Sequence, residues 1–147
     1  MKKLFKISIL TAILGIALMG CKDPDDNGGS NGGNNGGGGI NAGNWPAATL
    51  LAKYGLDGLN RPTGASNVIY AEQNLFLAIN FEGNASTASA VKNYFNNSSN
   101  GWTEESVVVS TEATVTSYSK ESENTNYAAS FTEMEKIFQI SVTKYSY

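Results

Sequence analysis

A long segment rich in glycine and asparagine limits how much of this 147-residue chain can fold. Residues 22–44 contain nine glycines and six asparagines, and Ile40 is their only large apolar side chain. Such a segment buries too little apolar surface to offset the entropy cost of ordering it, so we expect it to be disordered. The folded part is therefore predicted to be residues 45–147, which suffices for one small domain with a single core.

The first twenty residues have the three parts of an export signal. Lys2, Lys3 and Lys6 make the start positively charged, and residues 7–19 form a mostly apolar run. A helix needs about 20 apolar residues to span a bilayer, so this run is short for a permanent span. A charged start, a short apolar run and small residues at its end are typical of a cleaved signal peptide, predicted here as residues 1–20.

The apolar run ends in Leu18-Met19-Gly20-Cys21. This tetrapeptide resembles the lipobox of bacterial lipoproteins, although Met is less usual than Ala or Ser at its second position. The resemblance covers residues 1–21 and implies cleavage before Cys21, attachment of diacylglycerol to its thiol and a palmitate-type anchor in the outer membrane. Stable anchoring requires more than one acyl chain, which this modification provides. An ordinary signal peptide followed by a chance cysteine is the alternative.

A charged cluster follows directly, made of Lys22, Asp23, Asp25 and Asp26. A lysine and clustered acids at this place resemble the surface-export signal of Bacteroidetes lipoproteins, although Pro24 interrupts the match. The resemblance implies display on the outside of the cell. A polar tether whose acids only keep it solvated is the alternative, and an orientation toward the periplasm is left open.

The types of residue present exclude several classes of site. Cys21 is the only cysteine, and the chain has no histidine. With Cys21 lipidated and residues 22–44 as a tether, residues 45–147 have no disulfide and must be held by their core. The usual zinc and copper sites are excluded, and we expect no cofactor. Loss of residues 1–20 leaves 7 basic and 13 acidic residues, a net charge of −6, which is unsuited to binding nucleic acid.

Apolar periodicity in residues 45–147 predicts two short helices and five to six strands. Pro46 suits the first turn of one helix, and Gly55 suits its left-handed end, with Leu56 folding back onto Leu51. Asn84 is the expected N-cap of the other helix. The predicted helices are residues 46–54 and 85–95, and the predicted strands are residues 67–71, 75–82, 105–110, 113–120, 127–132 and 137–145.

This order, α-β-β-α-β-β-β-β, predicts an α+β domain in which both helices pack on one face of an antiparallel sheet. The spacing of Ala48, Leu51 and Tyr54 recurs in the second helix. A duplicated helix-strand-strand unit accounts for this recurrence, and convergent amphipathic patterning accounts for it about as well.

Side chains suited to catalysis are scarce. Nucleophilic serine catalysis normally needs a base such as histidine, and the Ser-Tyr-Ser-Lys stretch at residues 117–120 falls on a predicted strand. Two carboxylate pairs, Glu104 with Glu105 and Glu133 with Glu135, are candidates for glycosidase chemistry by residue type alone. Solvated charges beside turns are the interpretation we favour, so we expect no enzymatic activity.

Four aromatic residues are candidates for a binding platform. Trp45 and Trp102 each begin a predicted element, while Tyr118 and Tyr127 lie on strands rich in serine and threonine. Tyrosines on a solvated sheet face offer large contact area to a sugar or a protein at low entropy cost. We favour the simpler interpretation, in which the tryptophans cap the core and the tyrosines cover sheet edges.

The leading hypothesis is a non-enzymatic, membrane-anchored binding module at the cell surface, with an unidentified protein or glycan partner. The alternative is a carbohydrate-handling accessory protein or a weak carboxylate-based hydrolase, which needs two acids converging beside a tryptophan. A third possibility is an envelope structural subunit whose last strand, residues 137–145, forms an open sheet edge.

Overall fold

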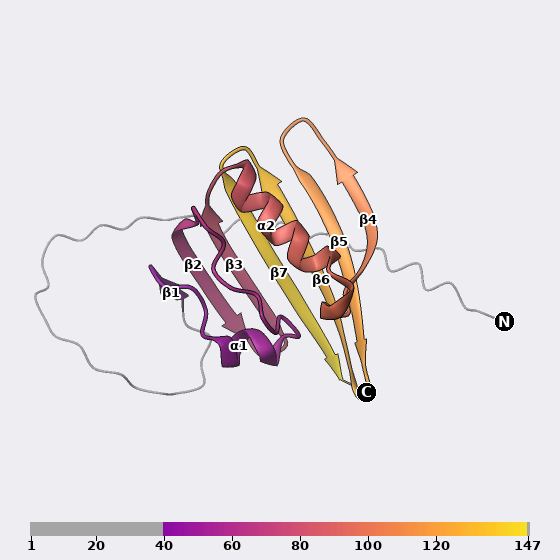
Figure 1. The fold of residues 1–147 in the computed structure, drawn as a ribbon. Helices are drawn as coiled ribbons and strands as arrows, with labels where there is room; N and C mark the ends of the chain where they lie inside the picture. Colours follow the sequence, from indigo (N-terminus) through magenta and orange to yellow (C-terminus); the bar gives the residue numbers. More distant parts are fainter. Residues whose placement is uncertain (1–39, 147) are drawn as a thin grey trace, which may run out of the picture. The chain divides into compact units, whose positions relative to one another are not determined.

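The computed structural model describes residues 40–146. They form an α+β fold with a seven-stranded antiparallel sheet and two α-helices (Figure 1). The predictions for Cys21, Lys22, Asp23, Asp25 and Asp26, and for the signal peptide, concern residues outside this range. The elements in chain order are β1 Ile40–Ala42, α1 Ala48–Lys53, β2 Ser66–Gln73, β3 Phe76–Glu82, α2 Ala85–Asn96, a 3-10 turn Ser98–Asn100, β4 Thr103–Val109, β5 Thr114–Ser122, β6 Thr125–Met134 and β7 Ile137–Ser146.

The sheet has more strands than predicted, and the chain order begins with a strand instead of a helix. Ile40–Ala42 pairs antiparallel with β2, with Ile40 opposite Ala71, and the amide of Gly43 donates to the carbonyl of Val68 at 2.8 Å. The prediction of disorder up to residue 44 is therefore wrong for these three residues. Their side chains gave no strand signal, because what orders them is main-chain pairing with a neighbour from elsewhere in the chain.

The strand order across the sheet is β1-β2-β3-β7-β6-β5-β4. The last strand, β7, lies in the middle and pairs with both β3 and β6. It is therefore not the open edge that the structural-subunit hypothesis required. Within residues 40–146, the two edges of the sheet are β1 and β4.

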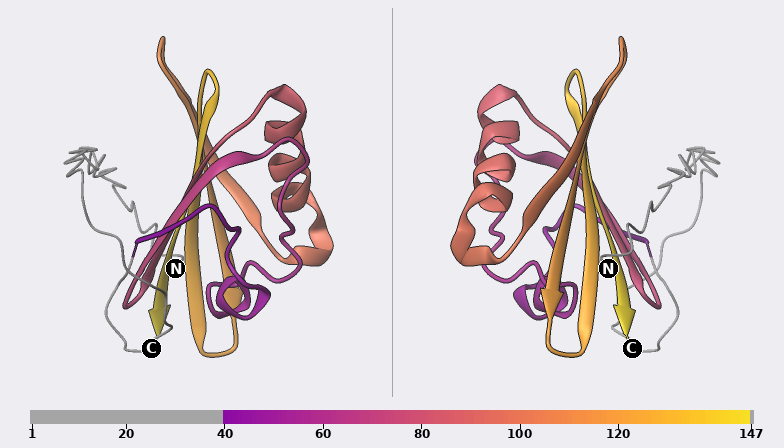
Figure 2. Two further views of the ribbon diagram at one scale, coloured as in Figure 1. Left: turned by 90° about the vertical axis from the view of Figure 1, so that its left-hand side faces the viewer. Right: turned by 90° about the vertical axis from the view of Figure 1, so that its right-hand side faces the viewer.

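Both helices lie on the same side of the sheet (Figure 2), as predicted. We call the side that they cover the inner face and the opposite side the outer face. Because alternate residues of a strand point to opposite faces, each strand contributes one set of side chains to each. The largest fully buried side chains of the core are Tyr54, Tyr118, Phe81, Phe95, Phe131, Leu56, Leu77, Ile79, Ile140, Val68, Val91 and Val142.

Local signals place both helices. Gly55 ends α1 with a φ of 71°, its amide bonds to the Ala52 carbonyl at 3.0 Å, and the Leu56 amide bonds to the Leu51 carbonyl at 2.9 Å. These two bonds are the predicted C-terminal motif. Asn84 caps α2 as predicted. Neither helix within residues 40–146 is long and apolar enough to cross a membrane.

The start of α2 is fixed by reciprocal hydrogen bonds. The side chain of Asn84 accepts from the amides of Ser86 and Thr87, and the Thr87 hydroxyl accepts from the amide of Asn84. Gly83 precedes this capping box, where a Cβ atom would lie 2.7 Å from the Thr87 side chain. The helix therefore enters the inner layer at a fixed angle, which sets where its apolar stripe meets the sheet.

Candidate interaction surface

The second carboxylate pair singled out in the sequence does not form a site. Glu133 lies on the inner face of β6, where its carboxylate contacts the Lys92 ammonium of α2 at 2.8 Å. Glu135 lies in the β6–β7 turn with a positive φ of 43° and is exposed. One acid is thus engaged in an interlayer ion pair while the other faces solvent.

The first pair is also divided. Glu104 lies opposite Tyr118 on β5, and Glu105 accepts a hydrogen bond from the Ser119 hydroxyl. The register places Glu133 opposite Thr114, four residues along β5 from Tyr118 and on the far side of that strand from β4. The two pairs therefore do not converge as glycosidase chemistry would require.

The Ser-Lys arrangement within residues 117–120 is separated by the sheet itself. Ser117 belongs to the outer face, whereas Lys120 belongs to the inner face, because their spacing is odd. The Lys120 ammonium donates to the Gly55 carbonyl at 2.9 Å and lies 3.8 Å from the Asp57 carboxylate. The Lys120 ammonium therefore binds groups just after the end of α1. No group of three acidic or cysteine side chains within residues 40–146 could hold a metal ion.

Two of the four candidate aromatic residues are buried in the core. Phe95 of α2 stacks on Tyr118 with ring centroids 4.4 Å apart and meets Trp102 edge-on at 5.3 Å. Burial raises the pKa of Tyr118 above its usual value, and the nearby charge of Glu104 adds to the shift. The suggestion that Trp102 and Tyr118 form an accessible platform is therefore wrong. Strand alternation could not show that the helices cover their face.

The other two pack against the same core and are partly exposed. Tyr127 lies on the inner face, 6.3 Å from Trp102 between ring centroids. Trp45 meets Phe81 edge-on at 5.5 Å, and its indole nitrogen donates to the Leu59 carbonyl at 3.3 Å. Both rings thus pack against the core and remain only partly exposed.

The outer face carries small side chains where the inner face carries large ones. Ser141, Ser130, Ser117 and Ser106 lie opposite one another across β7, β6, β5 and β4, and Ala78 continues this row on β3. The hydroxyls of Ser130 and Ser141 are 2.7 Å apart. In the next row, Gln139 donates to Asn80 at 3.0 Å. The centre of this face is therefore flat and polar, with side chains that bond to each other.

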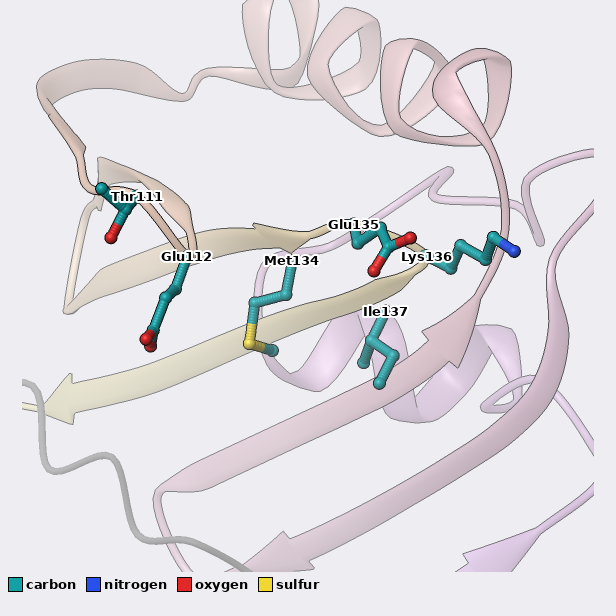
Figure 3. A pocket seen from close by; sticks show the side chains of 6 residues that line it. All are labelled: Thr111, Glu112, Met134, Glu135, Lys136 and Ile137. Carbon is teal, nitrogen blue, oxygen red and sulfur yellow. The ribbon is translucent and has the colours of Figure 1, made fainter.

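Larger apolar groups lie toward both ends of the outer face. Phe76 and Tyr145 are exposed at one end, and Ile137 and Met134 lie opposite each other at the other. Beside the second pair is an open hollow of about 660 Å³ between the β4–β5 and β6–β7 turns (Figure 3). Its lining residues are Thr111, Glu112, Met134, Glu135, Lys136 and Ile137.

A second hollow, of about 470 Å³, lies on the helix side and is rich in amides. Asn93 and Asn97 line it from α2 and its C-cap, and Asn100 follows at helical spacing. Asn100 donates to the Tyr94 carbonyl at 2.8 Å, and the Tyr94 hydroxyl donates to the Asp57 carbonyl at 3.0 Å. Burial raises the pKa of Tyr94 to about 12. Sequence reasoning missed this hollow; the only signal for it is that Asn93, Asn97 and Asn100 recur every three to four residues.

Comparison of the chain with protein-family models, with curated protein sequences and with solved structures found no match. The chemistry open to the described residues therefore follows from their geometry. The outer face offers broad, shallow contact, and the amide-lined hollow offers directional hydrogen bonds beside a phenol ring.

Proposed function

We propose that this protein is a non-enzymatic interaction module of the cell envelope, anchored by lipid on Cys21 and displayed at the cell surface, that binds a partner protein through its outer face. The resemblances of the sequence up to Asp26 support the proposed anchoring and location. The single observation that supports the binding role is the outer face, which spans every strand of the sheet and is covered by no helix or strand among residues 40–146.

The composition of the outer face suits contact with a protein. Its centre is a row of serines that can donate and accept, while Phe76, Tyr145 and Ile137 expose apolar surface toward the ends. Protein interfaces commonly combine aromatic anchors with a polar surround. Because small side chains form the middle, a partner backbone can approach closely without displacing long flexible groups.

The anchor is tested with Cys21→Ala in the full chain. We expect the wild-type protein to fractionate with membranes and to incorporate labelled palmitate, and the variant to lose both properties. A variant that still matures and remains in the membrane fraction would show that the lipoprotein assignment is wrong. Digestion of intact cells by an external protease tests display, since a protein facing the periplasm resists it.

The binding surface is tested by photocrosslinking in intact cells. A benzoylphenylalanine placed at Phe76 reports on the outer face and keeps a phenyl ring at this exposed position. The same probe at Ser89, an exposed position on α2, is the matched control. We expect a discrete protein adduct from position 76 and none from position 89. Equal labelling from both positions, or none from either, contradicts the proposal.

Carbohydrate binding is a second candidate, and the amide-lined hollow is what favours it. Amide groups pair with sugar hydroxyls, and the Tyr94 ring gives the hollow one aromatic wall. Titration of the protein with envelope oligosaccharides, followed by calorimetry, tests this. We expect Asn93→Ala to abolish any heat of binding, with Asn96→Ala, exposed on the same helix outside the hollow, as the control.

A further inference from the structure

Strand β4 is an unusually open edge. It pairs with β5 on one side and has no neighbour on the other among residues 40–146. All seven of its residues, Thr103–Val109, are exposed. An unpaired edge presents main-chain N–H and C=O groups that can pair with a further strand. The opposite edge, β1, has only three residues and offers a much shorter template.

The protections of an edge strand found here are confined to its first half, where Glu104 lies opposite the inward-facing Tyr118 and the register is irregular. Proteins guard such edges with proline, inward-pointing charges, lysine, bulges or short length. No proline, lysine or arginine occurs from Asn97 to Ser119. One irregularity of register lies between Glu104 and Ser106, and beyond it Ser106 to Val109 pair regularly with β5. The second half of the edge is therefore regular in its register with β5.

The regular half ends in three consecutive valines. Val107, Val108 and Val109 are 49%, 61% and 73% exposed, which is unusual for β-branched side chains in a folded domain. The β4–β5 hairpin reaches past α2 in Figures 1 and 2, so the helical layer does not cover this end. Such residues favour extended pairing, and here they point to both faces of the edge.

The charged residues nearest to the valines along the chain are all acidic. Glu104 and Glu105 precede them and Glu112 follows in the β4–β5 turn, with no basic residue between Asn97 and Ser119. None of these three acids takes part in an ion pair within the described part of the chain. Antiparallel pairing of β4 with a second copy would bring six carboxylates to one seam, which charge repulsion opposes. A basic occupant meets the same groups favourably.

We propose that β4 accepts an extended segment of a partner protein as an eighth strand, with β-branched or apolar residues opposite the valines and lysine or arginine near Glu104, Glu105 and Glu112. This mode of recognition takes affinity from main-chain hydrogen bonds and specificity from alternate side chains and flanking charge. The inference rests on the proposed interaction function, but it uses the edge of the sheet, a surface separate from the centre of the outer face.

The direct test uses the full mature protein in detergent and a synthetic peptide, acetyl-KTVTVTK-amide, carrying a fluorophore. We expect saturable binding that weakens about tenfold when NaCl is raised from about 50 mM to about 500 mM, because screening shortens the reach of the carboxylates. A peptide with glutamate in place of both lysines should bind at least about tenfold more weakly. Hydrogen exchange should slow at amides of β4 and remain unchanged in the central strands.

Matched substitutions locate the site. Val108→Lys places a charge on the edge, and Leu75→Lys makes the same kind of change in the β2–β3 turn, at a position that is 50% exposed. The double variant Glu104→Lys with Glu105→Lys reverses the charge that precedes the valines. The double variant Glu121→Lys with Glu123→Lys changes the net charge by the same amount at the β5–β6 turn. We expect about tenfold or greater loss of binding in each edge variant and less than about twofold in each control.

Several results would overturn the proposal. These are no peptide binding by the wild type, equal binding by edge variants and controls, or binding that leaves the β4 amides unprotected. A concentration-dependent dimer in analytical ultracentrifugation that Val108→Lys dissolves would identify a second copy as the occupant instead. Circular dichroism checks that every variant is folded. A cellular adduct at Phe76 without peptide binding would retain the proposed function and reject only this use of the edge.

Discussion

The two faces of the sheet are built from the same strands but carry side chains of different size and polarity. On β3 and β7, the residues that point inward are large and apolar, whereas those that point outward include Ala78, Asn80, Gln139, Ser141 and Thr143. The inner face is covered by α1 and α2, and the outer face is covered by no element among residues 40–146. The buried core therefore lies on one side of the sheet, and the side chains of the other side contribute little to it.

The contrast is sharpest in the aromatic residues. Phe95 is enclosed by Tyr94, Trp102 and Tyr118, and its ring contacts all three. Phe76 on the outer face is 40% exposed and has no ring neighbour among the described residues. The same residue type thus serves to hold the layers together in one case and to offer surface in the other.

The largest expected difference between the faces is in the cost of removing these two rings. Phe95→Ala should lower the free energy of unfolding by about 3–5 kcal/mol, because it leaves a cavity inside the aromatic cluster. Phe76→Ala should cost less than about 1 kcal/mol, since little of the site is enclosed. Urea denaturation followed by circular dichroism measures both. Similar costs for the two substitutions would remove the distinction between the faces.

Alkaline pH should weaken the inner layer next. Burial, with the charge and hydrogen bond of Glu72, raises the pKa of Tyr54 to about 12, and burial raises that of Tyr94 to about 12. Folding therefore favours the protonated phenols, so their contribution is complete below about pH 10 and is lost as the pH rises toward 12. The free energy of unfolding should fall across this window.

Two variants show where this pH dependence arises. Tyr54→Phe and Tyr94→Phe should each reduce the decline between about pH 10 and 12. Thermal unfolding at a series of pH values measures the slopes. An unchanged slope in Tyr54→Phe would mean that its hydrogen bonds to Glu72 and to the Asn74 carbonyl do not couple ionisation to folding.

A smaller effect is expected at the start of α2. Asn84→Ala removes the acceptor for the amides of Ser86 and Thr87 and should cost about 1 kcal/mol. Asn93→Ala in the middle of the same helix should be neutral or slightly stabilising, because alanine has the higher helix propensity. Chemical denaturation of the two variants gives the comparison. An equal loss at both sites would show that the cap does not fix the inner layer.

The smallest effect concerns the ion pair between the layers. Lys92→Ala removes the partner of Glu133, and both side chains remain partly exposed, so we expect a loss of about 0.2–1 kcal/mol. The loss should shrink at about 1 M NaCl, where screening is strong. A loss above about 2 kcal/mol that persists in salt would mean that charge contributes to holding the layers in addition to apolar packing.

Short-range signals in the sequence carried much of the fold. The Gly55 motif, the Asn84 cap and the strand hairpin before α2 each depend on residues close together in the chain, and each was found where predicted. The start of α1 differed: the helix begins at Ala48, and its N-cap is Ala47, whose side chain cannot accept a hydrogen bond. Trp45 packs on Phe81, a contact between residues far apart in the chain that local propensity could not reveal.

The candidate site depended more heavily on tertiary structure. Alternation showed that the later strands have one polar face, but not that Tyr118 and Tyr127 belong to the covered one. Nor could it show that β4 would be an edge and β7 central, since strand order is set by pairing between remote segments. The position of the open edge beside Glu104 and the valines is therefore a result of topology.

The sequence by itself determined the types of residue available, the local turns and caps, and the resemblance of residues 1–21 to a lipoprotein signal. These follow from chemistry within a few residues of each position. Tertiary structure alone decided which face the helices cover, which strand is left unpaired and that Ile40–Ala42 joins the sheet. The reason is physical: burial and strand pairing are relations between distant segments, and only the folded chain brings those segments together.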